Sequence, residues 1–237
     1  TDWFYLVVDD VEITVGGGNG GNDDDDDDPV ADIAWGFESG MEGWTTINAN
    51  DDDHTWYHST ESGNHGTLAV DSHSGTGHMM SESFCNWTYA SIEPDDYLVA
   101  PQQIAVENGT TFSFWACAQD ANYQAEHFGV AVSTAGNTSA SDFTTISEWT
   151  IGAKVDAKGA ARGTREQTQW LQYTVNLSEY AGQNVWVAIR HFNCYDQFIL
   201  LVDDVEVTSG SKDRDGMWAY YDDGTLYDGI GGPTSFS

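Results

Sequence analysis

Short runs of alternating apolar and polar residues dominate the middle of the chain. Turn-forming Gly, Asn and Asp residues separate these runs, and no segment has the periodicity of a long amphipathic helix. The clearest runs are TTFSFWACA at 110–118, HFGVAVST at 127–134, WLQYTVNL at 170–177 and NVWVAIRHFN at 184–193. This pattern predicts an all-β fold, a jelly-roll β-sandwich.

The sequence of the first apolar segment returns at the end of this β-rich region. TDWFYLVVDDVEITVG at 1–16 and YDQFILLVDDVEVTSG at 195–210 agree at ten positions, including the whole of Asp-Asp-Val-Glu. Residues 1–15 are therefore interpreted as the terminal strand of a preceding repeat in a tandem array. A strand donated to a neighbouring subunit is the alternative, because an added strand satisfies an exposed sheet edge.

Shifts in composition divide the rest of the chain. Residues 16–30 form a Gly/Asp linker, since glycine is conformationally free and like charges repel. Residues 31–210 hold the predicted jelly roll. Residues 211–237 are too few for a core of their own, and an Asp-Gly turn among apolar residues predicts one or two strands there, the start of a following β module.

The charge of the chain narrows the choice of partners. Asp and Glu number 39 against seven Lys and Arg, which gives a formal net charge of -32. Such a surface repels nucleic acids and anionic membranes and attracts divalent cations, although adaptation to high salt would produce the same composition. No apolar stretch approaches the length of a bilayer span, and we expect a secreted protein of the cell surface.

Catalytic motifs are missing from the sequence. It contains no Gly-x-Ser-x-Gly, no His-Glu-x-x-His and no phosphate-binding loop, so we expect a binding module and not an enzyme. The three cysteines, Cys85, Cys117 and Cys194, permit one disulfide and leave one thiol. Cys117 is expected on a strand adjacent to His191 or Cys194, where a buried or oxidised cysteine is a simpler interpretation than a nucleophile.

Two polar segments are candidate calcium sites, because calcium takes hard oxygen ligands. One is a run of six aspartates that repel one another unless cations or a neighbouring protein surface neutralise them; the candidate ligands there are Asp23, Asp25 and Asp27. The other is a loop with oxygen ligands at a spacing of two, as in many calcium loops, formed by Asn48, Asn50 and Asp52. A solvated acidic turn is the alternative for this loop.

One segment between two predicted core strands gathers acidic, aromatic and imidazole side chains. Loops on a rigid scaffold are where binding residues concentrate. The candidate ligand-binding residues are Asp120, Tyr123, Glu126 and His127, with Trp56 and Trp87 as further aromatic residues that could stack on a sugar or a protein. The alternative is that the aromatic side chains belong to the core.

The region 31–208 resembles the cleaved adhesin family, the haemagglutinin/adhesin modules that follow the protease domain in gingipains. Five motifs carry the resemblance: FESGMEGWTTINANDDDHTW at 37–56, DDYLVAPQ at 95–102, FWACAQDANYQAEHFGVAVST at 114–134, LSEYAGQNVWVAIRHFNCYD at 177–196 and LLVDDVEV at 200–207. The resemblance implies a galactose-binding-like jelly roll, stabilisation by calcium and a role in adhesion.

The resemblance also implies a structural calcium ion where the first and last strands of the domain meet. Glu38, with Asp203 or Asp204, occupies the matching positions. The loop after TTI departs from the family, which typically has Asp-x-Asp-Gly-Asp where this chain has Asn-Ala-Asn-Asp-Asp-Asp at 48–53.

These features predict an extracellular, calcium-stabilised adhesin module of a tandem-repeat bacterial surface protein that binds proteins or glycans of a host or neighbouring cell. One alternative is a structural subunit of a surface filament or matrix, in which the basic loop at 152–167 contacts Asp23–Asp28 of an adjacent copy. The other is a carbohydrate-binding module appended to a hydrolase.

Overall fold

The computed structural model of the 237-residue chain describes residues 33–64, 71–152 and 167–210, together with the backbone of three short strands between 219 and 234. The predicted strand at 1–15, the linker at 16–30 with Asp23, Asp25 and Asp27, and almost all of the basic loop lie outside the described residues.

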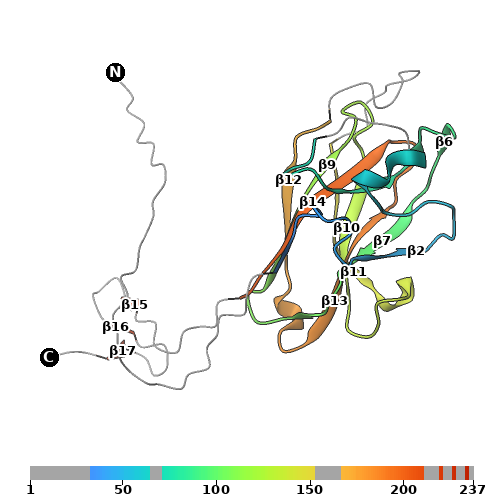
Figure 1. The fold of residues 1–237 in the computed structure, drawn as a ribbon. Coiled ribbons are helices and arrows are strands. Elements are labelled where there is room, and N and C mark those ends of the chain that lie inside the picture. Colours follow the sequence, from blue (N-terminus) through green and yellow to red (C-terminus); the bar gives the residue numbers. More distant parts are fainter. Residues whose placement is uncertain are drawn as a thin grey trace, which may run out of the picture.

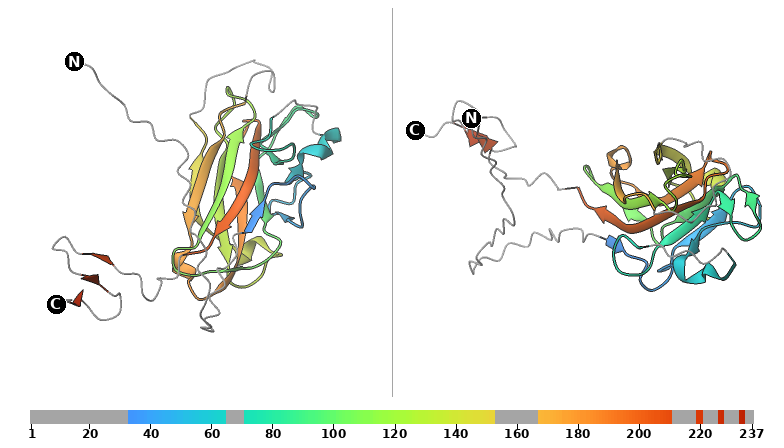
Figure 2. Two further views of the ribbon diagram at one scale, coloured as in Figure 1. Left: turned by 60° about the vertical axis from the view of Figure 1, so that its left-hand side comes forward. Right: turned by 90° about the horizontal axis from the view of Figure 1, so that it is seen from above.

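Two antiparallel sheets face each other in a jelly-roll sandwich, as the alternating pattern predicts (Figures 1 and 2). The first sheet has the order β12-β9-β14-β4-β3, with β1 paired to β14. The second has the order β11-β10-β13-β7-β2, with β8 paired to β13. The strands of the first sheet are β1 Ile33–Trp35, β3 Tyr57–His58, β4 Met79–Glu82, β9 Thr111–Ala118, β12 Leu171–Asn176 and β14 Ile199–Thr208. Those of the second are β2 Thr45–Asn48, β7 Asp95–Val99, β8 Ile104–Ala105, β10 His127–Ser133, β11 Thr144–Thr150 and β13 Asn184–Phe192.

Smaller elements complete the described parts of the chain. A hairpin of β5 Phe84–Cys85 and β6 Ala90–Ser91 projects from the sandwich. The 3-10 helices are η1 Ser59–Asn64, η2 Ala140–Asp142 and η3 Ser178–Tyr180. In the tail, β15 Ala219–Tyr220, β16 Leu226–Tyr227 and β17 Pro233–Thr234 form a three-stranded antiparallel sheet, where the sequence predicts one or two strands.

The core lies between the sheets and is rich in aromatic rings. Phe114 of β9 lies 6.0 Å from Phe128 of β10, so the contact joins the two sheets directly. Tyr173 and Trp149 pack on the same pair, with ring centroids 5.8 and 6.2 Å from Phe114. An aromatic side chain buries more apolar area than most other side chains. Aromatic residues therefore contribute strongly to the packing of the two sheets against each other.

The positions of the cysteines differ from those expected. All three are free, and Cys117 lies in β9 while His191 lies in β13 of the opposite sheet. The expectation that Cys117 neighbours His191 on an adjacent strand is therefore wrong. Cys194 does lie beside His191, with 3.1 Å between the sulfur and Nε2.

Removal of the central ring of the core should destabilise the domain strongly. Phe114 is fully buried, so Phe114→Ala removes its contacts and leaves a cavity, at a cost of about 3–5 kcal/mol in the free energy of unfolding. Leu171→Ala, on the neighbouring strand but 51% exposed, is the control and should cost under about 0.5 kcal/mol. Urea unfolding measures both, and equal losses would contradict the assignment of the core.

Candidate functional site

Three side-chain oxygens are buried without a hydrogen-bond partner where β2 and β7 lie side by side. They are Oδ1 of Asn48 and both carboxyl oxygens of Asp96, within the part of the chain that the structure describes. Asn48 and Asp96 are directly paired across the two strands, so their side chains stand on the same face of the sheet. Buried polar atoms are normally satisfied, and an unsatisfied cluster of oxygens calls for a cation or a proton.

Hydrogen bonds close the loop that follows β2 around this cluster. The amide nitrogen of Asn48 donates to the backbone oxygen of Asp52 at 2.5 Å, and that of Asn50 donates to the Asp52 carboxylate at 2.9 Å. Asn50 also donates to the backbone oxygen of Glu93 at 2.7 Å, which ties the loop to the start of β7. Asn50 therefore acts through its amide nitrogen and holds the loop, whereas Asn48 leaves its oxygen unused.

The Asp96 carboxyl shows how unfavourable a bare negative charge is at this position. Burial, followed by the nearby charges of Asp52 and Asp95, raises its pKa from 3.8 to about 8. Without a cation, Asp96 therefore holds a proton at neutral pH. The Asn48 and Asp96 oxygens, with the Asp52 carboxylate close by, are the hard ligands that calcium takes, so the residues present fit this ion. Sequence reasoning missed Asp96 because only the β2–β7 register reveals its neighbour.

The second predicted calcium site lies where β1 and β14 pair, Trp35 being opposite Val205. The Glu38 carboxylate accepts hydrogen bonds from the backbone N–H groups of Gly77 at 3.1 Å and Thr76 at 3.0 Å, which lower its pKa. Asp203 accepts from the backbone of His73 at 2.9 Å. Backbone N–H groups of one loop, residues 73–77, thus donate to carboxylates from the beginning and from the end of the domain sequence.

A β-bulge aims Asp204 at the same loop. The register of β14 against β9 shifts between Asp203 and Glu206, and Asp204 has a φ of +43°, a conformation unusual for a non-glycine residue. Its carboxylate lies 2.5 Å from Nδ1 of His73, whose ring stacks on Trp115 at 3.9 Å. The three carboxylates are already hydrogen-bonded here, so the observations for a cation are weaker than at Asp96.

The aromatic residues proposed for ligand stacking have different positions. Trp56 is 2% exposed and donates from Nε1 to the Asp96 backbone oxygen, and Tyr123 is 9% exposed within a core cluster. Neither has a free ring face, so both are core residues and the stacking hypothesis is wrong for them. Trp87 is 69% exposed and remains a candidate.

The polar residues proposed beside Tyr123 do not share one surface. Asp120 is buried and accepts from the backbone N–H of Asn122 at 2.8 Å, which stabilises the turn. Glu126 is also buried, 3.0 Å from His191. His127 instead bonds to Thr150 of β11 at 2.8 Å. The segment therefore supplies a turn, a buried polar cluster and a sheet-edge contact.

Exposed aromatic side chains lie on the β5–β6 hairpin and in the loop that follows β13. Trp87 is 69% and Tyr89 80% exposed, both in the turn that joins the two strands. Tyr195, 53% exposed, precedes Asp196, which bonds to Ser91 of β6 at 2.8 Å. We call Trp87, Tyr89 and Tyr195 the aromatic tip. Sequence analysis found only Trp87, because nothing local distinguishes the two tyrosines from core residues.

The described residues hold one serine–histidine–carboxylate chain, Ser81–His191–Glu126, and all three side chains are fully buried. Ser72 bonds to His78 at 2.8 Å, but burial lowers the pKa of His78 to about 4 and its second ring nitrogen has no partner. Burial also raises the pKa of the Cys117 thiol well above its usual range, which leaves it unreactive.

Comparison with known proteins agrees with this architecture. The family model described as the Cleaved Adhesin Domain matches residues 33–207. The chain belongs to the cleaved adhesin domain family. The K3 cleaved adhesin domain of Lys-gingipain from Porphyromonas gingivalis superposes with a TM-score of 0.66 at 39% identity, covering 76% of this chain and 100% of that one. The K1 domain of the same protein gives 0.60 at 38% identity, covering 76% and 99%.

The curated relatives are far longer than this cleaved adhesin domain. Hemagglutinin A of Porphyromonas gingivalis is 39% identical over 182 residues, which are 76% of this chain and 8% of the relative. Gingipain R1 of the same organism is 41% identical over 182 residues, 76% of this chain and 10% of the relative. The chain therefore spans a tenth or less of the length of these two relatives.

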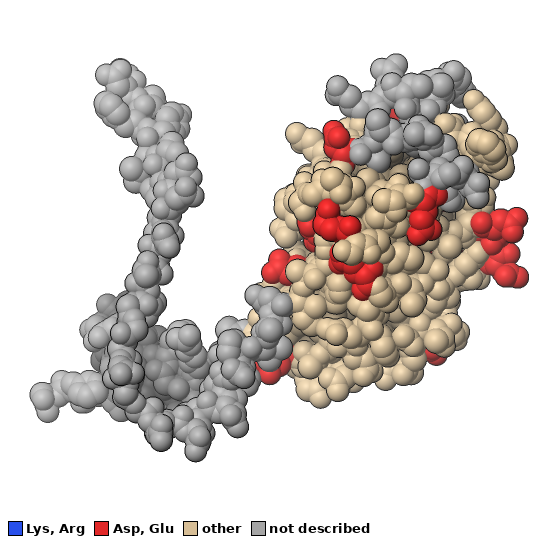
Figure 3. All heavy atoms as spheres, in the orientation of Figure 1, with Lys and Arg blue, Asp and Glu red and all other residues tan. Residues whose placement is uncertain are grey.

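The surface of this cleaved adhesin domain is acidic. Figure 3 shows clusters of Asp and Glu on the face in view. Arg190 is the one Lys or Arg within 33–64, 71–152 and 167–210, and it pairs in a bidentate manner with Asp95 at 2.7 and 3.0 Å. None of the described helices is both long and apolar enough to cross a bilayer.

The raised pKa of Asp96 predicts a pH dependence of stability in calcium-free buffer. Between pH 4 and 8 the folded chain keeps a proton on Asp96 that the unfolded chain releases, so stability falls as pH rises. Asp96→Asn should flatten this decline, measured as the midpoint of urea unfolding at several pH values. Asp203, with a pKa of about 7 raised by burial, leaves a residual slope of the same sign. Asp51→Asn, at an exposed position, is the control, and an unchanged slope in Asp96→Asn would refute the assignment.

Proposed function

We propose that this chain is an extracellular, calcium-stabilised adhesin module that binds a protein or glycan of a host or neighbouring cell surface. The observation that carries the calcium part is the set of buried, unpartnered oxygens on Asn48 and Asp96. The aromatic tip supports the adhesive part. The module belongs to a repetitive bacterial surface protein and performs no chemistry of its own.

Calcium answers an electrostatic problem that the fold creates. A net charge of -32 opposes compaction, and Asp96 is buried next to the Asp52 and Asp95 charges. A divalent ion coordinated by the Asn48 and Asp96 oxygens, with Asp52, replaces the proton on Asp96 and neutralises the cluster. Backbone carbonyls and water complete the 6–8 oxygens that calcium takes. The carboxylates of Glu38, Asp203 and Asp204 form a second proposed site.

Calcium should raise the stability of the chain, because a ligand bound only by the folded state stabilises it by mass action. At a hundredfold excess over the dissociation constant the gain is about 2.7 kcal/mol. Thermal melts with calcium or with chelator, at one high concentration of monovalent salt, test this expectation. Asp96→Asn should lose most of the calcium-dependent shift, and Asp51→Asn should keep it. An unchanged melting midpoint in the presence of chelator would favour salt adaptation as the origin of the acidic composition.

The aromatic tip is the surface best suited to adhesion. Trp87 and Tyr89 offer large apolar faces with a polar edge at the end of a hairpin, and such residues dominate the binding energy of many interfaces. The tip stands on a rigid sandwich, as binding loops do in other β folds. Exposed rings of this kind suit either a protein or the face of a sugar.

Loss of the two hairpin rings of the aromatic tip should weaken binding without loss of fold. We expect the double variant Trp87→Ala/Tyr89→Ala to bind erythrocytes at least about tenfold more weakly than the parent chain, because hot-spot rings carry most of an interface's energy. The measurement is binding of the fluorescently labelled chain to washed cells. Leu171→Ala removes an exposed apolar side chain elsewhere and serves as the control. Equal binding by the parent chain, the double variant and Leu171→Ala would exclude the aromatic tip as the binding surface.

The structure bears on the alternative of a carbohydrate-binding module. That alternative predicts a glycan affinity that depends on Tyr123 or Trp56, and both rings are buried. A glycan would therefore have to use the aromatic tip. The filament alternative depends on Asp23–Asp28 and on the loop at 152–167, which lie outside the described residues except for the ends of that loop.

A further inference from the structure

Three different metal-ligating atoms converge at the end of β13. His191 Nε2 lies 3.0 Å from Glu126 Oε2 and 3.1 Å from the sulfur of Cys194, and the sulfur lies 3.5 Å from the same carboxylate oxygen. One nitrogen, one oxygen and one sulfur thus form a closed triangle. Glu126 and His191 are fully buried, and Cys194 is half-buried in the loop after β13.

The shape of this triangle matches a tetrahedral zinc ion. Zinc binds nitrogen and oxygen at about 2.0–2.2 Å and sulfur at about 2.3 Å, which separates ligands of a tetrahedron by roughly 3.3–3.6 Å. The sulfur–oxygen distance already has this value, and the other two need an expansion of roughly half an ångström or less.

Neighbouring groups hold the ligands in position. Nδ1 of His191 bonds to Ser81 Oγ at 2.7 Å, so the ring is oriented with Nε2 toward Glu126 and Cys194. The other Glu126 oxygen accepts from Ser83 Oγ at 3.0 Å and from the Phe198 backbone N–H at 2.7 Å. Outer partners of this kind, on the second ring nitrogen and the second carboxylate oxygen, are characteristic of metal sites.

The same arrangement suits a metal better than a catalytic relay. In a relay the imidazole uses its two nitrogens for two different partners, one being the nucleophile and the other the carboxylate. Here Ser81 and Glu126 do occupy the two nitrogens of His191, but Ser81 is fully buried, so a substrate has no access to its hydroxyl. Cys194 faces the same nitrogen as Glu126, Nε2, and so does not take the place of the nucleophile. A zinc ion bonds all three atoms at once, and its double charge balances one thiolate and one carboxylate.

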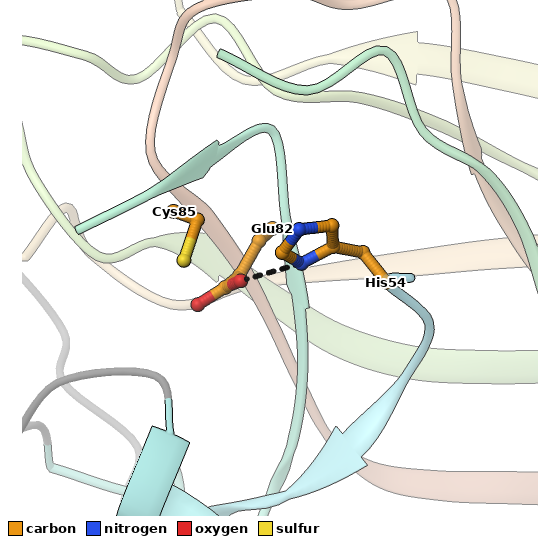
Figure 4. A group of neighbouring side chains, drawn as sticks. All are labelled: His54, Glu82 and Cys85. Carbon is orange, nitrogen blue, oxygen red and sulfur yellow. Dashed lines mark hydrogen bonds and ion pairs between the residues drawn. The ribbon is translucent and has the colours of Figure 1, made fainter. Parts of the chain in front are cut away.

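A second cluster of the same residue types lies on the other side of the chain segment 81–85. His54 Nδ1 lies 3.2 Å from Glu82 Oε2, with Cys85 on the far side of the carboxylate (Figure 4). Tyr57 also bonds to Glu82, at 3.3 Å. The three ligand atoms lie within 4.8 Å of one another but do not form the closed triangle seen at Cys194. This cluster supplies a matched control.

We propose that Glu126, His191 and Cys194 form a binding site for zinc or a similar borderline-soft divalent metal, distinct from the calcium sites. The fourth coordination position is left to water. Asp96 of the proposed calcium site is paired with His191 across β7 and β13, so the two sites are neighbours on one sheet face. Their ligand chemistry separates them, because calcium does not take sulfur.

Titration of the full chain with Co²⁺ tests the proposal, since cobalt replaces zinc and its bond to a thiolate absorbs in the near ultraviolet. The chain is kept reduced and saturated with calcium, so that oxygen-only sites stay filled. We expect a thiolate–cobalt band that saturates with cobalt and disappears when zinc is added. Cys194→Ser should remove this band, and Ser81→Ala should weaken cobalt affinity by about 10–100-fold through loss of the outer hydrogen bond.

Cys85→Ser is the matched control, because it removes the sulfur of the other cluster. A band that survives in Cys85→Ser and is lost in Cys194→Ser supports the site. A parent chain without the band, or a Cys194→Ser variant with an undiminished band, overturns it. If circular dichroism shows that Cys194→Ser is unfolded, the affinity of Ser81→Ala decides, and affinity equal to that of the parent chain overturns the proposal.

Discussion

The scarcity of positive charge is the constraint on which the described structure depends. Arg190 is the one Lys or Arg among residues 33–64, 71–152 and 167–210. The fold nevertheless buries several carboxylates of these segments almost completely: Glu82, Asp96, Asp120, Glu126 and Asp203. Burial of an isolated charge is expensive, so each carboxylate needs a hydrogen-bond donor, a proton or a metal. Lys and Arg are too scarce to neutralise these carboxylates. The candidate metal sites lie where other groups have to stabilise a buried carboxylate instead.

The groups that stabilise these carboxylates in place of Lys or Arg differ from one position of the sandwich to another. Asp203 and the exposed Glu38 are served by backbone N–H groups of one loop, a solution that needs no second charge. Glu126 has an imidazole, a hydroxyl and a backbone N–H around it. Asp96 has no donor at all and carries a raised pKa instead. Asp96 is thus the carboxylate with the greatest need for a cation, and this difference places its site first among the candidates without reference to relatives.

The strands were predictable and the partners of the polar residues largely were not. Inward residues recur with a period of two, so β9, β10, β12 and β13 lie within one residue of the predicted runs at each end. The loop at 48–53 was predicted as a candidate site because its polar residues are close in sequence. The other candidate residues come together only through strand pairing. Asp96 lies opposite Asn48, 48 positions away in the sequence, and Glu126 contacts His191, 65 positions away. Trp56 and Tyr123 were misjudged because an aromatic residue near a loop has the same local sequence whether its ring turns inward or outward.

The segment from β4 to the β5–β6 hairpin connects the proposed metal sites to the aromatic tip. Ser81 and Ser83 point to His191 and Glu126, and the chain then runs directly into the hairpin that carries Trp87 and Tyr89. A metal that fixes His191 and Glu126 therefore also fixes the base of the hairpin. Rigid presentation of a binding surface lowers the entropy lost on association. On this argument the proposed metals would act twice, by neutralising buried carboxylates and by holding the exposed rings in a geometry ready to bind.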